Sequence, residues 1–265
     1  MKSPKRSQRP PRYTKGHNPA PKAEEALILY GIHTVAAALA NPERKAIRLR
    51  ATENALARLA ESVDLSQKLD GIPVDPVSAQ ELTKSLPADA VHQGVALEVE
   101  PLDPLPLDHL GPARFIVALD QVTDPHNVGA IMRSAVAFGA DAIMTPWRHS
   151  PRESAVLAKS ASGAVDLLAH IQVSNLGKGL AALKDQGFQA IGMDSEGAEP
   201  FSGLTVSDKV VLVLGAEGKG LRQGVRATCD TIARIELPGA LTSLNVSNAA
   251  AIAFYAITES QKRSA

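Results

Sequence analysis

The sequence predicts an α/β protein built of two units, and three observations support this prediction. Short apolar runs alternate with helical stretches along the chain from residue 26 onward. In the second unit these runs are continuously apolar, which is typical of parallel strands that are buried on both faces of a sheet. With 265 residues, 45% of them hydrophobic and 21% charged, the chain has the length and composition of one large or two modest globular domains.

Residues 1–25 are expected to form a basic, disordered arm. The first 23 residues hold seven Lys or Arg and no acid, so the other 21 basic residues face all 28 acidic ones. Residues 1–23 therefore carry +7 and the rest of the chain −7, although the whole chain is formally neutral. Five prolines exclude a continuous helix, and with it an amphipathic transit peptide. Such an arm either only keeps the protein in solution or tethers RNA phosphates.

The composition excludes several classes of protein. A single cysteine, Cys229, rules out a disulfide framework and a cysteine-rich zinc site. The longest apolar stretch near the C-terminus, residues 249–257, is too short to span a bilayer. No apolar segment follows the basic start, as one would in a secretory signal. We therefore expect a cytoplasmic protein that has no metal site and no membrane partner.

The first unit, residues 26–100, is expected to be a small α/β domain. Its last apolar run alternates with polar residues, which predicts a half-buried strand, and Ser78 is a suitable cap for one of its helices. Three prolines within residues 101–108 predict a linker over 101–113. The strands of this unit are expected at 27–30, 46–50 and 95–99, and its helices at 31–40, 54–62 and 78–86.

The second unit, residues 114–265, is expected to contain a parallel sheet flanked by helices. Its apolar runs do not alternate with polar residues, and a helical stretch separates most of them, as in strand–helix–strand units. The strands are expected at 115–119, 142–144, 190–193 and 210–214, and the helices at 128–138, 154–162, 176–186 and 246–259.

Two common nucleotide-binding motifs are absent from this unit. A dinucleotide-binding fingerprint needs glycines directly after the first strand, but here the first glycine after Leu119 is Gly129. A phosphate-binding Walker loop needs a lysine after its last glycine, and Leu221 stands there instead. Dinucleotide enzymes, Walker-type nucleotidases and the usual Rossmann-like methyltransferases, which also begin with a glycine-rich loop, are therefore excluded.

Three polar segments carry the remaining chemical information. In the first, residues 124–133, Asn127 is a good helix cap, Gly129 permits close packing of the backbone, and Arg133 shares a helix face with Gly129. By itself this segment is explained equally well as a capped helix with one solvated arginine.

The second segment, residues 210–221, is an apolar strand followed by three glycines at 215, 218 and 220. Such a turn exposes backbone N–H groups to a ligand, or it is simply a tight turn. Glu217 would repel a phosphate and suits a neutral or cationic ligand better. In the third segment, residues 235–248, the hydroxyls and amides exceed what a single helix cap requires.

Together these segments resemble the SpoU (TrmH) family of RNA ribose 2′-O-methyltransferases in the SPOUT superfamily. The first resembles the family's Asn-x-Gly-x-x-x-Arg signature, the second its Leu-Gly-x-Glu-Gly-x-Gly signature, and the third its Ser-Leu-Asn-Val-Ser signature. Residues 158–164 are similar to a further family segment, with Ala161 and Ser162 in reversed order. Residues 26–100 resemble the family's ribosomal-protein-like substrate-binding module through Leu29–His33 and His92–Ala96.

The resemblance implies a C-terminal domain with a parallel sheet and a trefoil knot, which pattern reasoning alone would not propose. It implies a homodimer, RNA as partner, S-adenosylmethionine as cofactor and, by closest likeness, a guanosine of 23S ribosomal RNA as target. The residues implied for cofactor binding are Gly215, Ile235, Leu237, Leu244, Leu214 and Gly220.

The residues implied for catalysis are Arg133, Asn127, Glu217, Ser243 and Asn245. A neutral arginine is costly at pH 7, so we expect Arg133 to bind a phosphate in bidentate fashion and to stabilise the developing alkoxide, rather than to act as a base. Glu217 either contributes directly or holds Arg133 in an ion pair. Weaker candidates for the base are His33, His126 and His149. Two basic groups are candidates for phosphate contacts. One consists of Arg148, Arg152 and Lys159, and the other of Lys45, Arg48 and Arg50.

Two other functions stay open. A non-catalytic relative would keep the fold but lose the polar site, and the presence of all five candidate catalytic residues argues against it. A tRNA-directed methyltransferase of the same family is the other alternative, and the separate N-terminal unit argues against a minimal enzyme of that kind.

Overall fold

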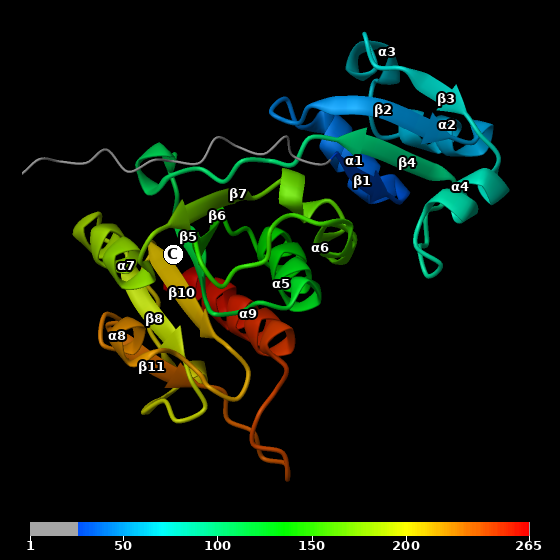
Figure 1. Ribbon diagram of the computed structural model, residues 1–265. Coiled ribbons are helices and arrows are strands. Elements are labelled where there is room, and N and C mark those ends of the chain that lie inside the picture. The colour runs from blue at the N-terminus through cyan, green and yellow to red at the C-terminus, as the bar shows by residue number, and fades with distance from the viewer. Residues whose placement is uncertain (1–25, 265) are drawn as a thin grey trace, which may run out of the picture.

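A computed structural model describes residues 26–264, so the arm expected at 1–25 lies outside the described part of the chain. Two sheets organise this part, a four-stranded sheet in the N-terminal unit and a seven-stranded sheet in the C-terminal unit. Figure 1 shows the smaller unit lying above one end of the larger sheet. The expected α/β class is confirmed for both units.

The N-terminal unit pairs its strands in the order β1-β4-β2-β3, with β4 antiparallel to both β1 and β2. The helix expected to start at Ser78 does so, because Ser78 and Glu81 form a capping box. The last strand is more buried than its alternation predicts, since Ala96 packs against Tyr30 and Leu82 on its second face. The elements are β1 (Leu27–Tyr30), α1 (Ile32–Ala40), β2 (Ala46–Ala51), α2 (Glu53–Ala60), α3 (Leu65–Lys68), β3 (Val74–Pro76), α4 (Ala79–Ser85) and β4 (Val95–Val99).

The C-terminal unit contains every strand expected there, and all of its strand pairs are parallel. The sequence does not reveal three further strands, β7, β9 and β11, because they are only partly buried and contain no continuous apolar run. Its elements are η1 (Leu107–His109), β5 (Phe115–Asp120), α5 (Pro125–Ala137), β6 (Ala142–Pro146), α6 (Ala155–Ala161), η2 (Ala164–Asp166), β7 (Ala169–Val173), α7 (Leu176–Asp185), β8 (Gln189–Met193), β9 (Glu199–Pro200), η3 (Phe201–Gly203), β10 (Val210–Gly215), α8 (Gln223–Arg226), β11 (Thr231–Arg234) and α9 (Val246–Ser264).

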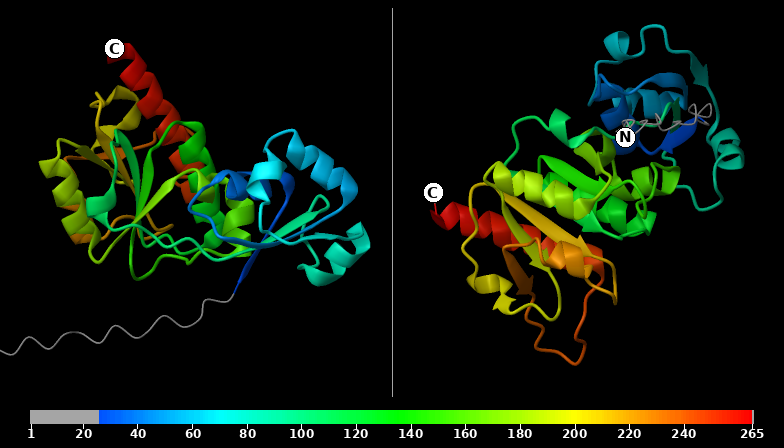
Figure 2. Two further views of the ribbon diagram at one scale, coloured as in Figure 1. Left: turned by 90° about the horizontal axis from the view of Figure 1, so that it is seen from above. Right: turned by 60° about the vertical axis from the view of Figure 1, so that its left-hand side comes forward.

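Helices cover both faces of this sheet, which explains its continuously apolar strands. Along β5, Val117 and Leu119 belong to the cluster that includes α5 and α9, whereas Ile116 and Ala118 belong to the cluster that includes α7 and α8. Figures 1 and 2 show the sheet between these two helix pairs. Phe254 of α9 is fully buried against the sheet.

The strand order β7-β6-β5-β10-β8-β11-β9 brings distant segments together. The chain leaves β5 toward β6 and β7 at one edge, and β10 later inserts between β5 and β8. In this register Gly215 at the end of β10 lies beside Asp120 at the end of β5. The loops that follow β5 and β10 therefore meet at a point where the strand order reverses, which is where open α/β sheets bind ligands.

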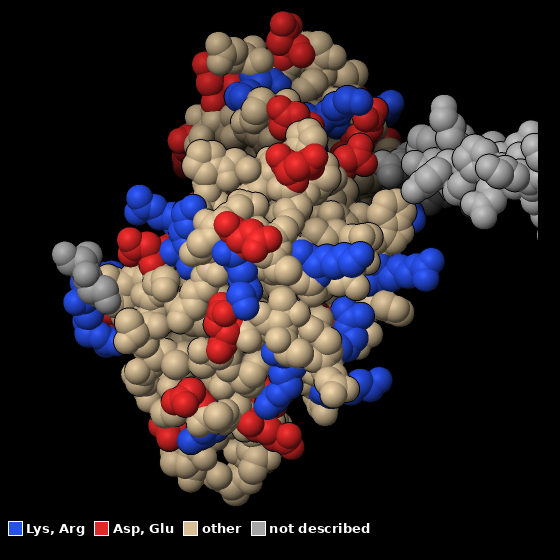
Figure 3. Space-filling model, turned by 90° about the vertical axis from the view of Figure 1, so that its left-hand side faces the viewer, with Lys and Arg blue, Asp and Glu red and all other residues tan. Residues whose placement is uncertain are grey.

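The two units are joined by packing as well as by the chain. The expected linker at 101–113 contains η1, and Leu105 forms a parallel bridge with Ile171 at the edge of the large sheet. Gly163 lies so close to α1 that a Cβ there would come within 2.8 Å of the Ala37 methyl group. On the face in Figure 3, acidic and basic side chains intermix over the upper, smaller unit, and basic ones line one margin of the larger unit.

Candidate functional site

The three segments singled out in the sequence meet at one cluster of hydrogen bonds. Glu217 Oε1 accepts from Asn127 Nδ2 at 3.2 Å, from Asn245 Nδ2 at 2.8 Å and from the Val246 N–H at 3.2 Å. Asn245 Nδ2 also donates to Asn127 Oδ1 at 2.9 Å. One carboxylate oxygen thus links the start of α5, the loop after β10 and the start of α9.

Asn127 reaches this cluster because it is not the helix cap, so the expectation that it caps α5 is wrong. The cap is Asp124, whose Oδ1 accepts from the His126 N–H at 2.9 Å, and Pro125 occupies the first turn. Asn127 therefore lies inside the first turn, where its side chain is available to Glu217. Gly129 has the expected packing role, because a Cβ there would lie 2.6 Å from the Leu157 carbonyl oxygen of α6.

The glycines after β10 form a tight turn with Glu217 at its tip. The Gly220 N–H donates to the Ala216 carbonyl at 2.9 Å, and a Cβ on Gly215 would lie 2.5 Å from the Gly220 carbonyl oxygen. Gly218 and Gly220 have φ angles of +73° and +60°, which side chains other than glycine rarely adopt. The turn thus fixes the backbone that carries Glu217.

An ion pair between a buried aspartate and an exposed arginine fastens this turn to β5. The fully buried Asp120 accepts from the Arg222 N–H at 2.8 Å and from Arg222 Nε at 2.7 Å, and Arg222 Nη2 lies 2.6 Å from its Oδ1. Nearby, Asp194 pairs with Arg226 at 2.6 Å. Sequence reasoning missed both pairs, although an aspartate that ends an apolar strand was a signal for the first.

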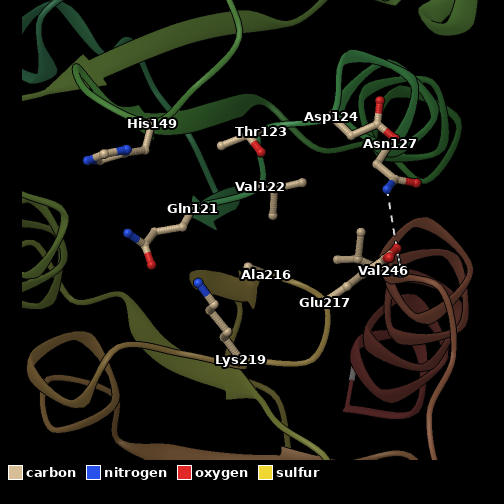
Figure 4. Close-up of a pocket in the computed structure, with 10 residues that line it drawn as sticks. All are labelled: Gln121, Val122, Thr123, Asp124, Asn127, His149, Ala216, Glu217, Lys219 and Val246. Atoms are coloured by element: carbon tan, nitrogen blue, oxygen red, sulfur yellow. Dashed lines mark hydrogen bonds between the residues drawn. The ribbon is translucent and has the colours of Figure 1, made fainter.

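A cavity of about 390 Å³ opens beside the cluster (Figure 4). Its lining contains Asn127 and Glu217 among the expected site residues, and none of the six expected cofactor residues. Gln121 and His149 both line it with φ angles above +60°, and such backbone conformations in non-glycine residues gather at functional sites. The cavity is lined by Gln121, Val122, Thr123, Asp124, Asn127, His149, Ala216, Glu217, Lys219 and Val246.

The expected cofactor residues divide into two groups. The Leu214 side chain is buried in the core, and Gly220 packs beneath the Asp194 carboxylate. Ile235 and Leu237 are half-buried, and Leu244 is 37% exposed. Ile235, Leu237 and Leu244 belong to the segment that leads from β11 to α9. Within this segment, residues 236–244 form no main-chain to main-chain hydrogen bond with any residue of 26–264.

Arg133 and Ser243 stand apart from the cluster. Arg133 is exposed on α5, does not line the cavity, and has no hydrogen bond or ion pair with any described residue. The alternative in which Glu217 holds Arg133 in an ion pair is therefore not present in this structure. Ser243 is exposed in the loop before α9.

The histidines named above lie in different places. His126 contacts Ser160 Oγ at 3.3 Å, His33 is exposed on α1, and only His149 lines the cavity. A different histidine, His170, is hydrogen-bonded to Thr145 Oγ1, and burial lowers its pKa to about 4.

The two expected basic groups differ in their partners. Lys45 pairs with Glu100 and Arg48 with Asp75, so acids offset two charges of the N-terminal group. Lys159 donates to the Val91 carbonyl at 2.9 Å and lies over the Tyr30 ring, where it helps to join the two units. Arg148 and Arg152 are exposed and have no acidic partner within the described part of the chain.

Two further observations concern residues 26–264 as a whole. No group of three or more His, Cys, Asp or Glu side chains is arranged there to hold a metal ion. None of the helices there combines the length and the apolar character needed to cross a bilayer.

Two family models match most of the chain. Residues 114–255 match the SpoU rRNA methylase family, and residues 28–105 match the RNA 2′-O ribose methyltransferase substrate-binding family. An uncharacterized tRNA/rRNA methyltransferase of Mycobacterium ulcerans is 36% identical over 211 residues, covering 77% of this chain and 67% of the relative. The putative TrmH family tRNA/rRNA methyltransferase YacO of Bacillus subtilis is 32% identical over 222 residues, covering 81% and 88%.

Solved structures show the same fold. The SpoU methyltransferase AviRb of Streptomyces viridochromogenes superposes with a TM-score of 0.74 at 21% identity, over 90% of this chain and 91% of that one. AviRb has also been solved in complex with the cofactor AdoMet, with a TM-score of 0.71 to this chain at 22% identity, over 89% of this chain and 91% of that one. The chain therefore belongs to the SpoU (TrmH) family of RNA 2′-O-ribose methyltransferases and has the family's substrate-binding domain on its N-terminal side.

Proposed function

We propose that this protein transfers a methyl group from S-adenosylmethionine to the ribose 2′-hydroxyl of a guanosine in 23S ribosomal RNA. The observation that carries the proposal is the hydrogen-bonded cluster of Asn127, Glu217 and Asn245 at the mouth of the cavity. It joins three distant segments at the point where the strand order reverses, and its residues are those that the family signatures single out. The separate N-terminal domain favours a ribosomal RNA over a small tRNA substrate.

The loop 236–244 has the character that an adenine-bearing cofactor requires. Its main-chain groups have no main-chain partners among the described residues, and Leu237 and Leu244 offer apolar surface beside them. A flat, apolar ring with hydrogen-bonding edges fits such a surface. Ile235, Leu237 and Leu244 would hold the adenosine part, and Gly215 and Gly220 would shape the adjoining turn. When bound, the cofactor supplies the electrophilic methyl group.

The cavity beside Glu217 would receive the target nucleotide. Asn127 and Asn245 are fixed by Glu217, so either amide is positioned in advance to orient a ribose. Ser243 lies outside the cavity lining, in the exposed loop before α9, and would contact the target only from there. Glu217 accepts three hydrogen bonds through one oxygen and is therefore first of all a positioning residue. Arg133 would bind the phosphate next to the target and stabilise the alkoxide as the 2′-hydroxyl loses its proton.

Arg133 requires a second copy of the chain to take this role, because it does not line the cavity of its own chain. We therefore include a homodimer in the proposal, formed through α5 and α9. In support, α9 buries Phe254 and Ile257 on one side and leaves Ile252 and Tyr255 45% and 58% exposed on the other. The trefoil knot and a cytoplasmic location belong to the same proposal, the first from the family's fold and the second from an RNA substrate.

The experiment is methyl transfer by the full chain from tritiated S-adenosylmethionine to unmodified RNA. Unmodified 23S ribosomal RNA and a pool of unmodified tRNA are tested side by side, and the modified nucleotide is mapped. We expect label at a single guanosine 2′-oxygen of 23S RNA. Label in the tRNA pool alone would overturn the ribosomal target. Failure to bind S-adenosylmethionine by calorimetry would favour a non-catalytic relative.

Arg133→Lys tests the role proposed for that residue. Lysine keeps the charge but loses the planar fork that binds two phosphate oxygens at once, so we expect transfer to fall by about tenfold or more while cofactor affinity is kept. Near-full activity of this variant would contradict bidentate binding.

A further inference from the structure

The loop between β6 and α6 presents an exposed aromatic ring beside the cavity. Trp147 is 71% exposed although it directly follows a buried strand, and it is the only tryptophan of the chain. The main-chain N–H of Trp147 donates to the Val173 carbonyl at 2.8 Å, so the backbone at this residue is held to the sheet edge. Tryptophan is enriched at binding surfaces, because its ring offers a large rigid apolar face together with one polar N–H.

The backbone that carries this ring lies close to the proposed nucleotide site. His149, two residues further along, lines the cavity and has a left-handed φ of +66°. Two residues of chain span at most about 7 Å, so the Trp147 backbone is within one nucleotide of the cavity wall. The Ser150 hydroxyl in the same loop is buried without a hydrogen-bond partner.

The charges of this loop are arranged to favour an anion outside it. Arg148 and Arg152 are exposed and unpaired among the described residues. The one acid of the segment 147–153, Glu153, is turned inward, where its carboxylate binds Arg44 at 2.8 Å and the Leu102 N–H at 2.8 Å. The loop therefore carries an exposed indole ring and two exposed guanidinium groups within six residues of chain, with no exposed acid between them.

We propose that Trp147 is a stacking platform for an unpaired RNA base that neighbours the target nucleotide, with Arg148 and Arg152 binding the phosphates on either side of that base. This inference rests on RNA being the substrate and adds the residues that hold the strand at the cavity. Indole rings stack on any base, and guanidinium groups bind phosphate with little regard to sequence. A single-stranded RNA with an accessible base is therefore the chemistry that this surface recognises.

The single tryptophan makes a direct test possible. The full chain is titrated with an unlabelled oligoadenylate of about 12 nucleotides, within the usual size range of single-strand sites, while tryptophan fluorescence is followed. An abasic oligomer of the same length and charge is the comparison. We expect quenching by the oligoadenylate and little by the abasic oligomer. Equal quenching by both, or RNA binding without quenching, overturns the proposal.

Variants measured with fluorescein-labelled RNA separate stacking from charge. Trp147→Ala should weaken binding by about five- to 150-fold, whereas Trp147→Phe, which keeps an aromatic ring, should stay within about threefold. Leu167→Ala is the matched control, because Leu167 is 63% exposed but lies outside this loop. Arg148→Gln and Arg152→Gln should each lower the salt dependence of binding by about 0.7 in slope. If Trp147→Ala binds RNA as tightly as the wild type does, the stacking platform is refuted.

Calorimetry with S-adenosylmethionine keeps this outcome distinct from that of the proposed function. Trp147→Ala should bind the cofactor as the wild type does, since the loop 236–244 is untouched. If the wild type fails to bind the cofactor but its tryptophan is quenched only by base-bearing RNA, the proposed function falls and the platform stands. If the cofactor binds and quenching is absent, the platform alone falls.

Discussion

Replacement of Arg44 by methionine tests whether a buried charge cluster holds the two domains together. Arg44 is 6% exposed and belongs to the N-terminal domain, but its guanidinium binds Asp166 Oδ1 at 2.8 Å and both oxygens of Glu153, at 2.8 and 3.0 Å. Burial alone would lower the pKa of Arg44, but its hydrogen bonds to Asp166 and Glu153 outweigh burial and raise that pKa. Arg44 therefore stays charged under all ordinary conditions.

The magnitude follows from what the substitution leaves behind. The side chains of Glu153 and Asp166 are 8% and 1% exposed, so Arg44→Met leaves two buried carboxylates without a cation. Each keeps one neutral donor, the Leu102 N–H for Glu153 and Asn41 Nδ2 for Asp166. Removal of one partner from a buried ion pair costs about 3–5 kcal/mol, and we expect a loss in this range in the free energy of unfolding.

The assay is urea unfolding followed by circular dichroism and by the fluorescence of Trp147. Lys45→Met is the matched control, because the adjacent Lys45 pairs with Glu100 while their side chains are 76% and 53% exposed. An exposed pair contributes little, so this variant should stay within about 1 kcal/mol of the wild type. If Arg44→Met also stays within that limit, or if Lys45→Met costs as much, the reasoning on the buried cluster is refuted.

Three further predictions address the site and the large sheet. Asp120→Asn should lower the free energy of unfolding by about 1–3 kcal/mol, because Arg222, which follows the turn carrying Glu217, loses its ion pair with residue 120. The same change should weaken S-adenosylmethionine binding. Urea unfolding measures the first effect and calorimetry the second. Partial burial lowers the pKa of His170 to about 4, so below about pH 6.5 the unfolded chain binds a proton that the folded chain does not. Stability should therefore fall by about 3 kcal/mol between pH 6.5 and pH 4, and His170→Gln should remove this part of the pH dependence in urea titrations. Gly129→Ala should cost about 1–3 kcal/mol by thermal or urea unfolding, because its methyl group would push α6 away from α5.

The Asp120 and Gly129 predictions each have a control on the same chain. Asp75→Asn removes an aspartate whose side chain is 46% exposed, and Gly111→Ala adds a methyl group that meets nothing within 4 Å, so neither should matter. An Asp120→Asn variant with wild-type stability and cofactor affinity would show that this ion pair does not hold the turn. The His170 argument fails if the glutamine variant keeps the full acid dependence. If Gly129→Ala is as stable as Gly111→Ala, then α6 moves to accommodate the added methyl group at no cost.

The local pattern of the sequence was sufficient for most of the large sheet. Strands such as β5 and β10 are buried on both faces, so each is a nearly continuous apolar run that the sequence alone reveals. The partly buried strands β9 and β11 lack that signal. They form because neighbouring strands leave edges to be paired, which depends on contacts far along the chain.

The same division holds for the site. The three polar segments stand out in the sequence because their glycines, amides and carboxylate exceed what turns and caps require. The role of each side chain depended on competition between neighbouring residues. Asp124 caps α5, so the Asn127 side chain is available to donate a hydrogen bond to Glu217.

The sequence by itself therefore determined the α/β class, the positions of the main strands along the chain and the segments that carry chemistry, since these follow from local spacing. Only the tertiary structure decided that Asp120 secures the glycine turn, that Arg44 joins the domains and that Trp147 stands exposed beside the cavity. Partners of this kind are separated by tens of residues, and a hydrogen bond between them depends on a distance in space that no local pattern encodes.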